Sequence, residues 1–502
     1  MSDSFNLPWV VSLIERLRPD LCQLFPEVEG SRGIGFLNWL ITSGQQEYLA
    51  LRDDPEFRAL LQTIDTQSGL PFLAALIYAA RTDVQALYPL ENGNKAFLTW
   101  FEQYGIPEHA LTELMHPIEN DDVLKKPADF GVNLIGYVYG QLGIGEDLRM
   151  AARSLLAADV PMSIIDFAPG SDVPQNDFSM KSYVTSKGEY AFNIFCMTAM
   201  EQGRYYAERS CHQLKGHYSI GYWPWELGQW PADWQDLTGL VDEVWVSTQH
   251  TFNSLAPVCS KPVQVMPMAV ELGPISDWGS RLKTREHFGL PLNAKLFCFA
   301  FDLKSYVDRK NPQACVDAFL QAFPEGEFST DEVGLVIKVH KPSAPDLAWE
   351  RLKNQAIQDE RIHIIELTLS RPDLLALYQA CDCFLSLHRA EGFGRGLAEA
   401  LQLGLHVITT GYSGNVDFCK PPFADLVNYR LIAIEPGQYP YSEGQVWADP
   451  DVKHTAELMR AFVTKASSRI VKKFWPEFSA PVIGRRYKAR LEYIYQQLVN
   501  QH

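Results

Sequence analysis

The stretch "CFLSLHRAEGFGRGLAEALQLG" at residues 383–404 reads as an apolar strand, a glycine-rich turn and a helix in direct succession. Glu391 lies in the turn, and the backbone N–H groups of Gly392–Gly394 are predicted to stand at the start of the helix. Glu399 falls in the second helical turn, from which its carboxylate can point back toward the same place. A carboxylate accepts two hydrogen bonds at once, which suits the adjacent hydroxyls of a ribose. The alternative for Glu399 is an ordinary solvated helix residue.

Alternating strands and helices extend over most of the chain. The strand candidates up to residue 270 are "FGVNLIGYV", "MSIIDF", "YAFNIFCMT", "HYSIGYW", "EVWVST" and "VQVMPMAV". After the linker-like "ELGPISDWGSRLKTREHFGLPLN", a second set comprises "KLFCFAFD", "VGLVIKVH", "RIHIIEL", "CFLSLH" and "HVITT". Near-continuous apolar strands separated by helices are typical of parallel sheets covered on both faces. We therefore predict the α/β class, with two doubly wound Rossmann-like domains at residues 126–280 and 281–475 that face a cleft.

Residues 1–125 are predicted to be all helical, because apolar residues recur there at helical spacing. The segment "RPDLCQLFP…FLNWLITSGQQEY" from residue 18 returns from residue 81 as "RTDVQALYP…FLTWFEQYGIPEH". Two copies do not make a solenoid. They predict a compact helical domain built from a duplicated unit.

The composition excludes several classes of protein. A net charge of −17 argues against non-specific nucleic-acid binding, and no apolar run reaches the ~20 residues that span a bilayer. Nine scattered cysteines form no disulfide or zinc pattern, and the first residues do not resemble a signal peptide. We predict a cytoplasmic protein, with peripheral contact to the inner membrane left open.

Two further segments are candidates for ligand contact. Gly143 and Gly145 stand between a strand and a helix, where glycine lets a backbone approach a ligand, although turn geometry alone also explains them. In "FDLKSYVDRKNP", the cations Lys304, Arg309 and Lys310 precede a helix and suit a diphosphate. The alternative for these three residues is a solvated charge run.

The turn and its flanks, "RPDLLALYQACDCFLSLHRAEGFGRGLAE" and "GLHVITTGYSGNVDF", resemble the E-x7-E region of retaining GT-B glycosyltransferases, specifically family 4. "RKNP" resembles the family's lysine loop, and "YSEGQVWADPD" and "FSAPVIGRRYKARL" are similar to the tail of a bacterial polysaccharide-type subgroup. The resemblance spans roughly residues 128–500 in matching order. It implies the GT-B fold, with a C-terminal helix at residues 476–502 that crosses back to the first Rossmann-like domain.

The resemblance also implies roles for individual residues. Glu391 corresponds to the glutamate near the donor sugar, Glu399 to the one that binds ribose, and Lys310 to the lysine on the diphosphate. Arg395 replaces the leucine often found after the glycine turn and adds a cation near the donor sugar. No catalytic metal is expected.

An acceptor contact is predicted in "GYWPWELGQWP" at residues 221–231. Trp225 could stack on a sugar, and Glu226 could bind an acceptor hydroxyl, because a charge within an apolar run needs a partner. Ordinary core packing is the alternative for the tryptophan.

Together these features predict a metal-independent retaining glycosyltransferase that moves a hexose-type sugar from a UDP- or GDP-sugar to a glycan or lipid-linked acceptor, as in polysaccharide biosynthesis. The predicted catalytic residues are Glu391, Lys310 and Arg309. The predicted donor contacts are Gly143, Gly145, Lys304, Gly392, Phe393, Gly394, Arg395 and Glu399. The alternatives are a non-catalytic glycan- or nucleotide-sugar-binding protein, a protein-glycosylating transferase, and an epimerase or phosphorylase of the same fold.

The helical domain is predicted to govern acceptor engagement or assembly, with a partner or oligomer contact left open. Its alternative is a structural one, in which the helices only cover an apolar face of the first sheet.

Overall fold

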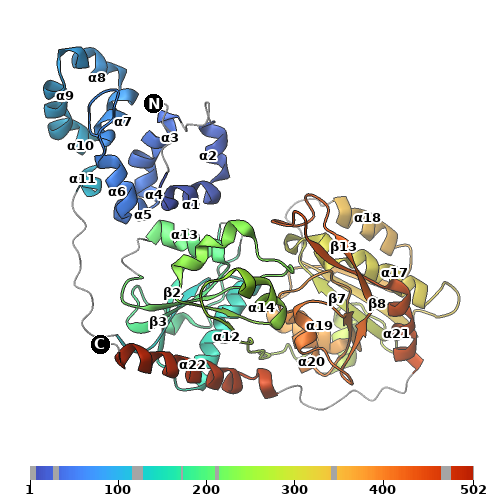
Figure 1. Ribbon diagram of the computed structural model, residues 1–502. Helices are drawn as coiled ribbons and strands as arrows, with labels where there is room; N and C mark the ends of the chain where they lie inside the picture. The colour runs from blue at the N-terminus through green and yellow to red at the C-terminus, as the bar shows by residue number, and fades with distance from the viewer. Residues whose placement is uncertain are drawn as a thin grey trace.

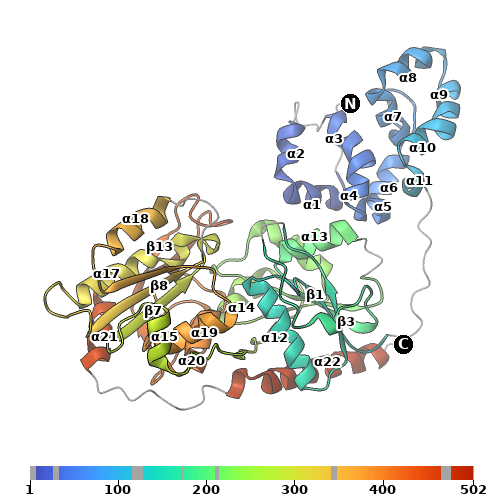
Figure 2. The ribbon, with the colours of Figure 1, turned by 180° about the vertical axis from the view of Figure 1, so that it is seen from behind.

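The computed structural model describes residues 7–26, 33–115, 128–170, 173–209, 214–340, 347–464 and 476–500, without the side chains of Lys304 and Pro476. Figures 1 and 2 show three parts: a helical domain and two α/β domains side by side. The α/β class and the GT-B architecture predicted from the sequence are confirmed, because each α/β domain is built on its own six-stranded parallel sheet.

The helical domain repeats its architecture as well as its sequence. Its helices are α1 Trp9–Leu17, α2 Pro19–Leu24, α3 Ile34–Trp39, α4 Gln45–Glu47, α5 Ala50–Asp53, α6 Pro55–Gln62, α7 Phe72–Ala80, α8 Thr82–Leu87, α9 Lys95–Trp100, α10 Ile106–Glu108 and α11 Thr112–Met115. A π-helical turn, η1 Leu40–Gly44, follows α3, and a second one, η3 Phe101–Gly105, follows α9. Each unit therefore runs through the same helix, π turn and short helix.

The first Rossmann-like domain has strand order β2-β1-β3-β4-β5-β6, all parallel. Its strands are β1 Asp129–Gly136, β2 Met162–Asp166, β3 Tyr190–Cys196, β4 Tyr218–Tyr222, β5 Glu243–Val246 and β6 Val263–Val265, and its helices are α12 Gly143–Ala157, α13 Ala199–Arg209 and α14 Gln249–Leu255. Buried residues fill every position of β5 and all but the first two of β1, which explains why these strands read as near-continuous apolar runs.

The second domain has strand order β12-β11-β10-β7-β8-β9. Its strands are β7 Lys295–Phe301, β8 Val333–Val339, β9 Ile362–Glu366, β10 Cys383–Ser386, β11 His406–Thr410 and β12 Ala424–Val427, with an antiparallel pair, β13 Tyr429–Ala433 and β14 Val446–Pro450. Its helices are α15 Arg281–His287, α16 Val307–Lys310, α17 Pro312–Ala322, α18 Leu347–Ala356, α19 Arg371–Ala380, α20 Arg395–Gln402 and α21 Val452–Thr464. The segment interpreted as a linker contains the helix α15. This helix packs on α19, and Arg285 of α15 donates to the Ala380 carbonyl at the end of α19 at 2.9 Å.

The last helix, α22 Ala480–Asn500, lies against α12 of the first domain (Figures 1 and 2). Gly484 makes this approach possible, since a Cβ there would lie 1.9 Å from the Ser154 carbonyl oxygen. Arg490 pairs with Glu243 at 2.6 Å, and Tyr487 donates to the Tyr222 hydroxyl at 3.1 Å. The chain thus returns to the first domain after completing the second.

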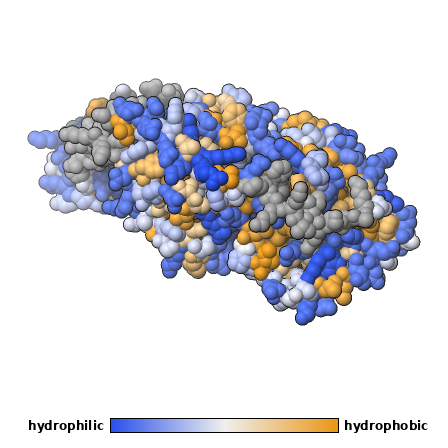
Figure 3. Space-filling model, turned by 90° about the horizontal axis from the view of Figure 1, so that it is seen from below, coloured by the Kyte–Doolittle hydropathy of each residue, from blue (hydrophilic) through white to orange (hydrophobic). Residues whose placement is uncertain are grey.

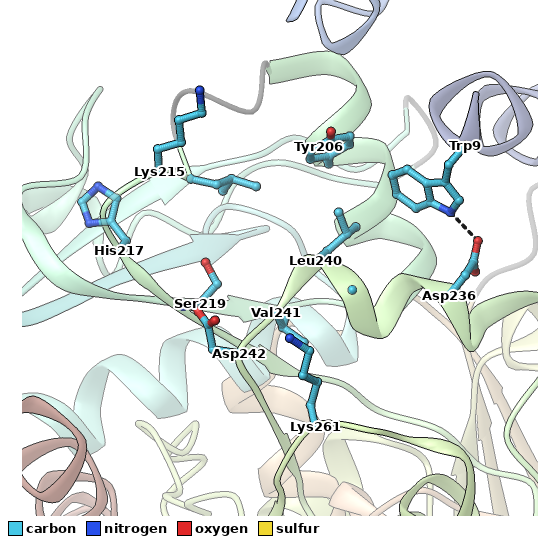
Figure 4. A pocket seen from close by; sticks show the side chains of 12 residues that line it. Trp9, Tyr206, Lys215, His217, Ser219, Asp236, Leu240, Val241, Asp242 and Lys261 are labelled. Atoms are coloured by element: carbon cyan, nitrogen blue, oxygen red, sulfur yellow. Dashed lines mark hydrogen bonds between the residues drawn. The ribbon is translucent and has the colours of Figure 1, made fainter. Parts of the chain in front are cut away.

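The helical domain is docked on α13 of the first domain. Leu13 of α1 packs over Gly203, where a Cβ would meet the leucine side chain at 3.0 Å. Beside this contact Arg16 pairs with Asp236 at 2.7 Å, and the same carboxylate accepts from the Trp9 indole. Figure 4 shows the cavity of about 600 Å³ at this seam, with Trp9 on one side and Tyr206 and Leu240 opposite. A single apolar cluster crosses from the helical domain into the first Rossmann-like domain.

None of the helices in the described ranges has the length and hydrophobicity that crossing a membrane requires. The face in Figure 3 shows hydrophobic side chains in patches divided by hydrophilic ones.

Candidate functional site

The glycine turn lies at the carboxyl end of β10, where the first domain meets the second. Gly394 has φ of +93°, in the left-handed region that favours glycine, and α20 begins at the next residue. A Cβ on Gly392 would lie 2.8 Å from the Trp225 carbonyl oxygen of the first domain. The Thr248 hydroxyl donates to the Gly392 carbonyl at 2.8 Å, also across the domain boundary. The turn is therefore held at the interface between the two sheets.

Glu391 of this turn meets Lys310 and Arg309, which lie at the end of α16. Lys310 donates to one carboxylate oxygen of Glu391, and Arg309 approaches the other at 3.3 Å. Only 12%, 18% and 6% of the Glu391, Lys310 and Arg309 side chains are exposed. Arg309 also donates to the Ala390 carbonyl at 2.9 Å, which fixes α16 against the turn.

The electrostatics of this group keep Glu391 ionised. Burial alone raises the pKa of Glu391, but the adjacent Lys310 and Arg309 outweigh it and hold that pKa at about 2. Burial lowers the pKa of Lys310, and the Glu391 carboxylate opposes this effect. The site thus places one guanidinium and one ammonium group around the Glu391 carboxylate.

Glu226 completes this group from the first domain. Its carboxylate accepts from the Tyr439 hydroxyl at 2.7 Å and lies 3.9 Å from Arg309. The structure thus brings the predicted acceptor glutamate next to the predicted catalytic residues, across the domain boundary.

The stacking role of Trp225 has to be corrected. Its side chain is buried, its indole N–H donates to the Gln229 carbonyl at 2.7 Å, and its ring packs edge-on against Trp230, Trp234 and Tyr439. A ring enclosed in this way offers no face to a sugar, so core packing, the alternative stated for this residue, describes it.

Buried polar residues next to Glu391 hold the turn in place. They were not among the candidates predicted from the sequence. The Glu391 backbone N–H donates to the Ser413 hydroxyl at 2.9 Å. His388 is fully buried between Ser386, at 3.0 Å from its Nδ1, and Asn415, at 3.1 Å from its Nε2. Burial lowers the pKa of His388 to about 4, so its imidazole is neutral at pH 7. A signal for this residue was present in "SLHRAEG", where a histidine follows directly on an apolar strand.

Glu399 belongs to a second, separate charged group. It is only 2% exposed and accepts from Arg371 at 2.8 Å. Burial raises the pKa of Glu399, and Arg371 opposes that effect. Next to this pair Arg395 donates to Asp147 of α12, and Glu146 lies 4.0 Å from Arg371. These contacts connect α12 of the first domain with α19 and α20 of the second.

The remaining predicted donor contacts differ in surroundings. α12 begins at Gly143, whose Cβ position is open, whereas a Cβ on Gly145 would lie 2.4 Å from the Gly140 carbonyl oxygen. Close backbone packing therefore explains Gly145 without a ligand. The Phe393 side chain is buried, and its ring packs on Phe418. Lys304 lies in η9 Leu303–Ser305, and its side chain is outside the described residues.

Residues 305–426 match the family model of glycosyl transferases group 1. This segment of the second domain is thus similar to group 1 glycosyltransferases. The matched segment runs from the loop before α16 to β12 and includes Arg309, Lys310, Glu391 and Glu399. A comparison with curated proteins returns no match.

Three solved structures are among those similar to this chain. The sucrose-phosphate synthase of Thermosynechococcus elongatus is 14% identical, with 74% of this chain and 97% of that one covered and a TM-score of 0.47. HepE of Anabaena, in complex with UDP and glucose, is 13% identical, with 74% and 99% covered and a TM-score of 0.47. WaaG, a glycosyltransferase involved in lipopolysaccharide biosynthesis, is 13% identical, with 73% and 99% covered and a TM-score of 0.43.

The buried layer around His388 predicts a dependence of stability on pH. The pKa of His388 is about 4 in the folded chain and near 6.5 when exposed, so protonation favours unfolding. This contribution to stability is complete above pH 6.5 and is lost as the pH falls toward 4. We expect His388→Gln, which retains hydrogen-bonding groups toward Ser386 and Asn415, to flatten the decrease in Tm between pH 7.5 and 5. If the Tm profiles of the wild type and the variant run parallel, protonation of His388 does not cause the loss of stability at acidic pH.

Proposed function

We propose that this protein is a retaining glycosyltransferase that transfers a hexose-type sugar from a UDP- or GDP-sugar to a saccharide acceptor. The observation that supports the proposal best is the buried group of Lys310, Arg309 and Glu391 within the group 1 glycosyltransferase segment. Its position at the carboxyl ends of the strands, facing the first domain, is where open α/β sheets bind ligands.

The proposed chemistry uses the charges of this group. A nucleoside diphosphate leaves as an anion, and Lys310, Arg309 and the first N–H groups of α20 would stabilise that charge. Glu391 would lie beside the sugar and stabilise the positive charge that develops at its anomeric carbon. Glu226 would bind an acceptor hydroxyl, because it reaches this group from the opposite domain. Glu391 is not assigned as a covalent nucleophile.

A thermal-shift series with UDP- and GDP-sugars tests the proposal on the full chain. A ligand that binds only the folded protein stabilises it by about 2.7 kcal/mol at 100 times its Kd. We expect one nucleotide sugar to raise Tm, and the same compound to be hydrolysed slowly when no acceptor is present. Stabilisation without hydrolysis or transfer would instead support a non-catalytic nucleotide-sugar-binding protein.

Transfer is expected to survive EDTA. The diphosphate charge is assigned to Lys310, Arg309 and backbone amides, so chelation removes no group that the proposed step uses. The check compares initial rates before and after treatment with EDTA. A complete loss of transfer that manganese or magnesium restores would contradict the assignment.

Glu399→Ala is expected to weaken nucleotide binding by some ten- to a hundredfold, or about 1.5–3 kcal/mol, if its carboxylate binds the donor ribose. Arg371, its partner here, is 35% exposed and can turn to solvent when the carboxylate is lost. Titration calorimetry with UDP and GDP measures the effect, and Glu350→Ala, which removes an exposed ion pair with Lys353, is the matched control. Unchanged affinity in the Glu399 variant would refute the ribose assignment.

A further inference from the structure

The second unit of the helical domain contains a surface groove of about 530 Å³, far from the glycine turn in the sequence. Tyr88, Trp100 and Tyr104 contribute aromatic rings to its lining, and Asn92, Thr99 and Gln103 contribute amide and hydroxyl groups. We call this surface the repeat groove. Pockets that bind small ligands typically combine aromatic walls with a few polar groups.

The aromatic rings differ in exposure, and the Trp100 ring is held in place. Tyr104 is 60% exposed, and the half-buried rings of Tyr88 and Trp100 lie 6.1 Å apart at a shallow angle of 32°. Arg81 lies over the Trp100 ring at 5.8 Å from its centre and pairs with Asp83 and Glu108 at 2.7 and 2.6 Å. These contacts fix the indole before any ligand arrives, which reduces the entropy cost of binding.

The polar groups that line the groove are mostly neutral. Among the described lining residues Lys95 is the one charged side chain, and none is a carboxylate. A pyranose ring has C–H groups on its faces and hydroxyls around its rim, so it matches an aromatic surface edged by amides and hydroxyls. The net charge of −17 disfavours a polyanionic ligand. The chemistry of the groove thus favours a neutral saccharide.

The duplicated unit provides an internal comparison. In the first unit Arg18 lies over Trp39 at 5.8 Å and pairs with Asp20 and Glu47, so the framework around the tryptophan is the same. The residues that correspond to Gln103 and Tyr104 are Thr42 and Ser43. The exposed tyrosine and the long amide are therefore additions of the second unit, beyond what the shared framework requires.

We propose that the repeat groove binds a neutral saccharide and, given the proposed function, holds the distal part of an extended acceptor glycan. In Figures 1 and 2 the second unit, with α8–α10, lies at the end of the molecule away from the second Rossmann-like domain. The docking of α1 on α13 keeps it there. A glycan that reaches both places must be a chain of several sugars, so short acceptors would not use the groove.

An array of immobilised neutral oligosaccharides of three to ten sugars, probed with the full chain, tests the groove. We expect binding to fall about tenfold or more in Gln103→Ala/Tyr104→Ala. The matched control, Thr42→Ala/Ser43→Ala, changes the corresponding positions of the first unit and is expected to bind as the wild type does. Equal binding by both double variants, or no binding by the wild type, would overturn the proposal.

Calorimetry with UDP and GDP separates this inference from the proposed function. The Gln103/Tyr104 variant is expected to bind nucleotide as the wild type does, which also shows that it is folded. Saccharide binding without any donor binding in the wild type would refute the proposed transferase activity and leave the groove in place.

Discussion

Glu391→Gln is expected to lower the turnover of sugar transfer by about a hundred- to a thousandfold, while donor affinity changes by less than about threefold. The side chain keeps its size, but the carboxylate that faces Lys310 and Arg309 becomes neutral. Its negative charge is proposed to act mainly in the transition state, when positive charge develops on the sugar. Loss of that charge should therefore appear in the turnover rather than in binding of the ground state.

The same substitution also leaves two largely buried cations without their carboxylate, which is destabilising. The variant therefore has to be assayed well below its Tm, with nucleotide affinity measured on the same sample. Glu327→Gln is the control, since it removes a carboxylate from an exposed pair with Arg460 outside the cleft. Turnover within about threefold of the wild type would reduce Glu391 to a structural residue of the turn.

Most of the fold could be predicted from the sequence, because buried parallel strands leave a strong local signal. β5 and β8 are buried at every position and appear as near-continuous apolar runs, in which Glu243 and Lys338 are the charged residues. The signal fails where an element is short or exposed. α15 begins after the N-cap Ser280 within a segment rich in charged residues, and β13 is mostly exposed, so neither has the pattern of a buried element.

The candidate site was predictable in its charges but not in its pairings. Lys310, Arg309 and Glu391 stand at strand ends in the sequence, and topology alone brings such ends together. The partners of Glu399 and Arg395 could not be derived, because Arg371 and Asp147 are distant in sequence and meet them only through packing of helices. The predicted sugar-stacking role of Trp225 was wrong for a related reason. An aromatic run has the same sequence pattern whether it lines a cleft or fills a core.

Removing residues 1–125 is expected to yield an aggregated protein, although those residues contribute none of the proposed catalytic groups. Leu13 and Leu237 both pack against Gly203, Trp9 packs edge-on against Tyr206, and one apolar cluster spans the seam. Truncation exposes this face of α13 to water, and exposed apolar patches promote association. Aggregation would support the alternative in which the helices only cover an apolar face. In the structure the face that they cover is that of α13 and not that of the sheet itself (Figure 1).

A truncated chain with a polar surface in place of the exposed apolar face distinguishes between two roles of the helical domain, covering α13 and binding the acceptor. The shortened chain with Tyr206→Gln and Leu237→Gln makes the exposed face polar, and we expect it to remain soluble and to bind donor nucleotide within about threefold of the wild type. Since the repeat groove is absent from it, transfer to long glycans should fall at least tenfold while donor hydrolysis persists. Calorimetry, circular dichroism and the two rates decide the result. A folded, soluble chain that has lost donor binding would show that the helical domain shapes the cleft itself. The assignment of donor chemistry to residues after 128 and of long-glycan binding to the helical domain would then be wrong.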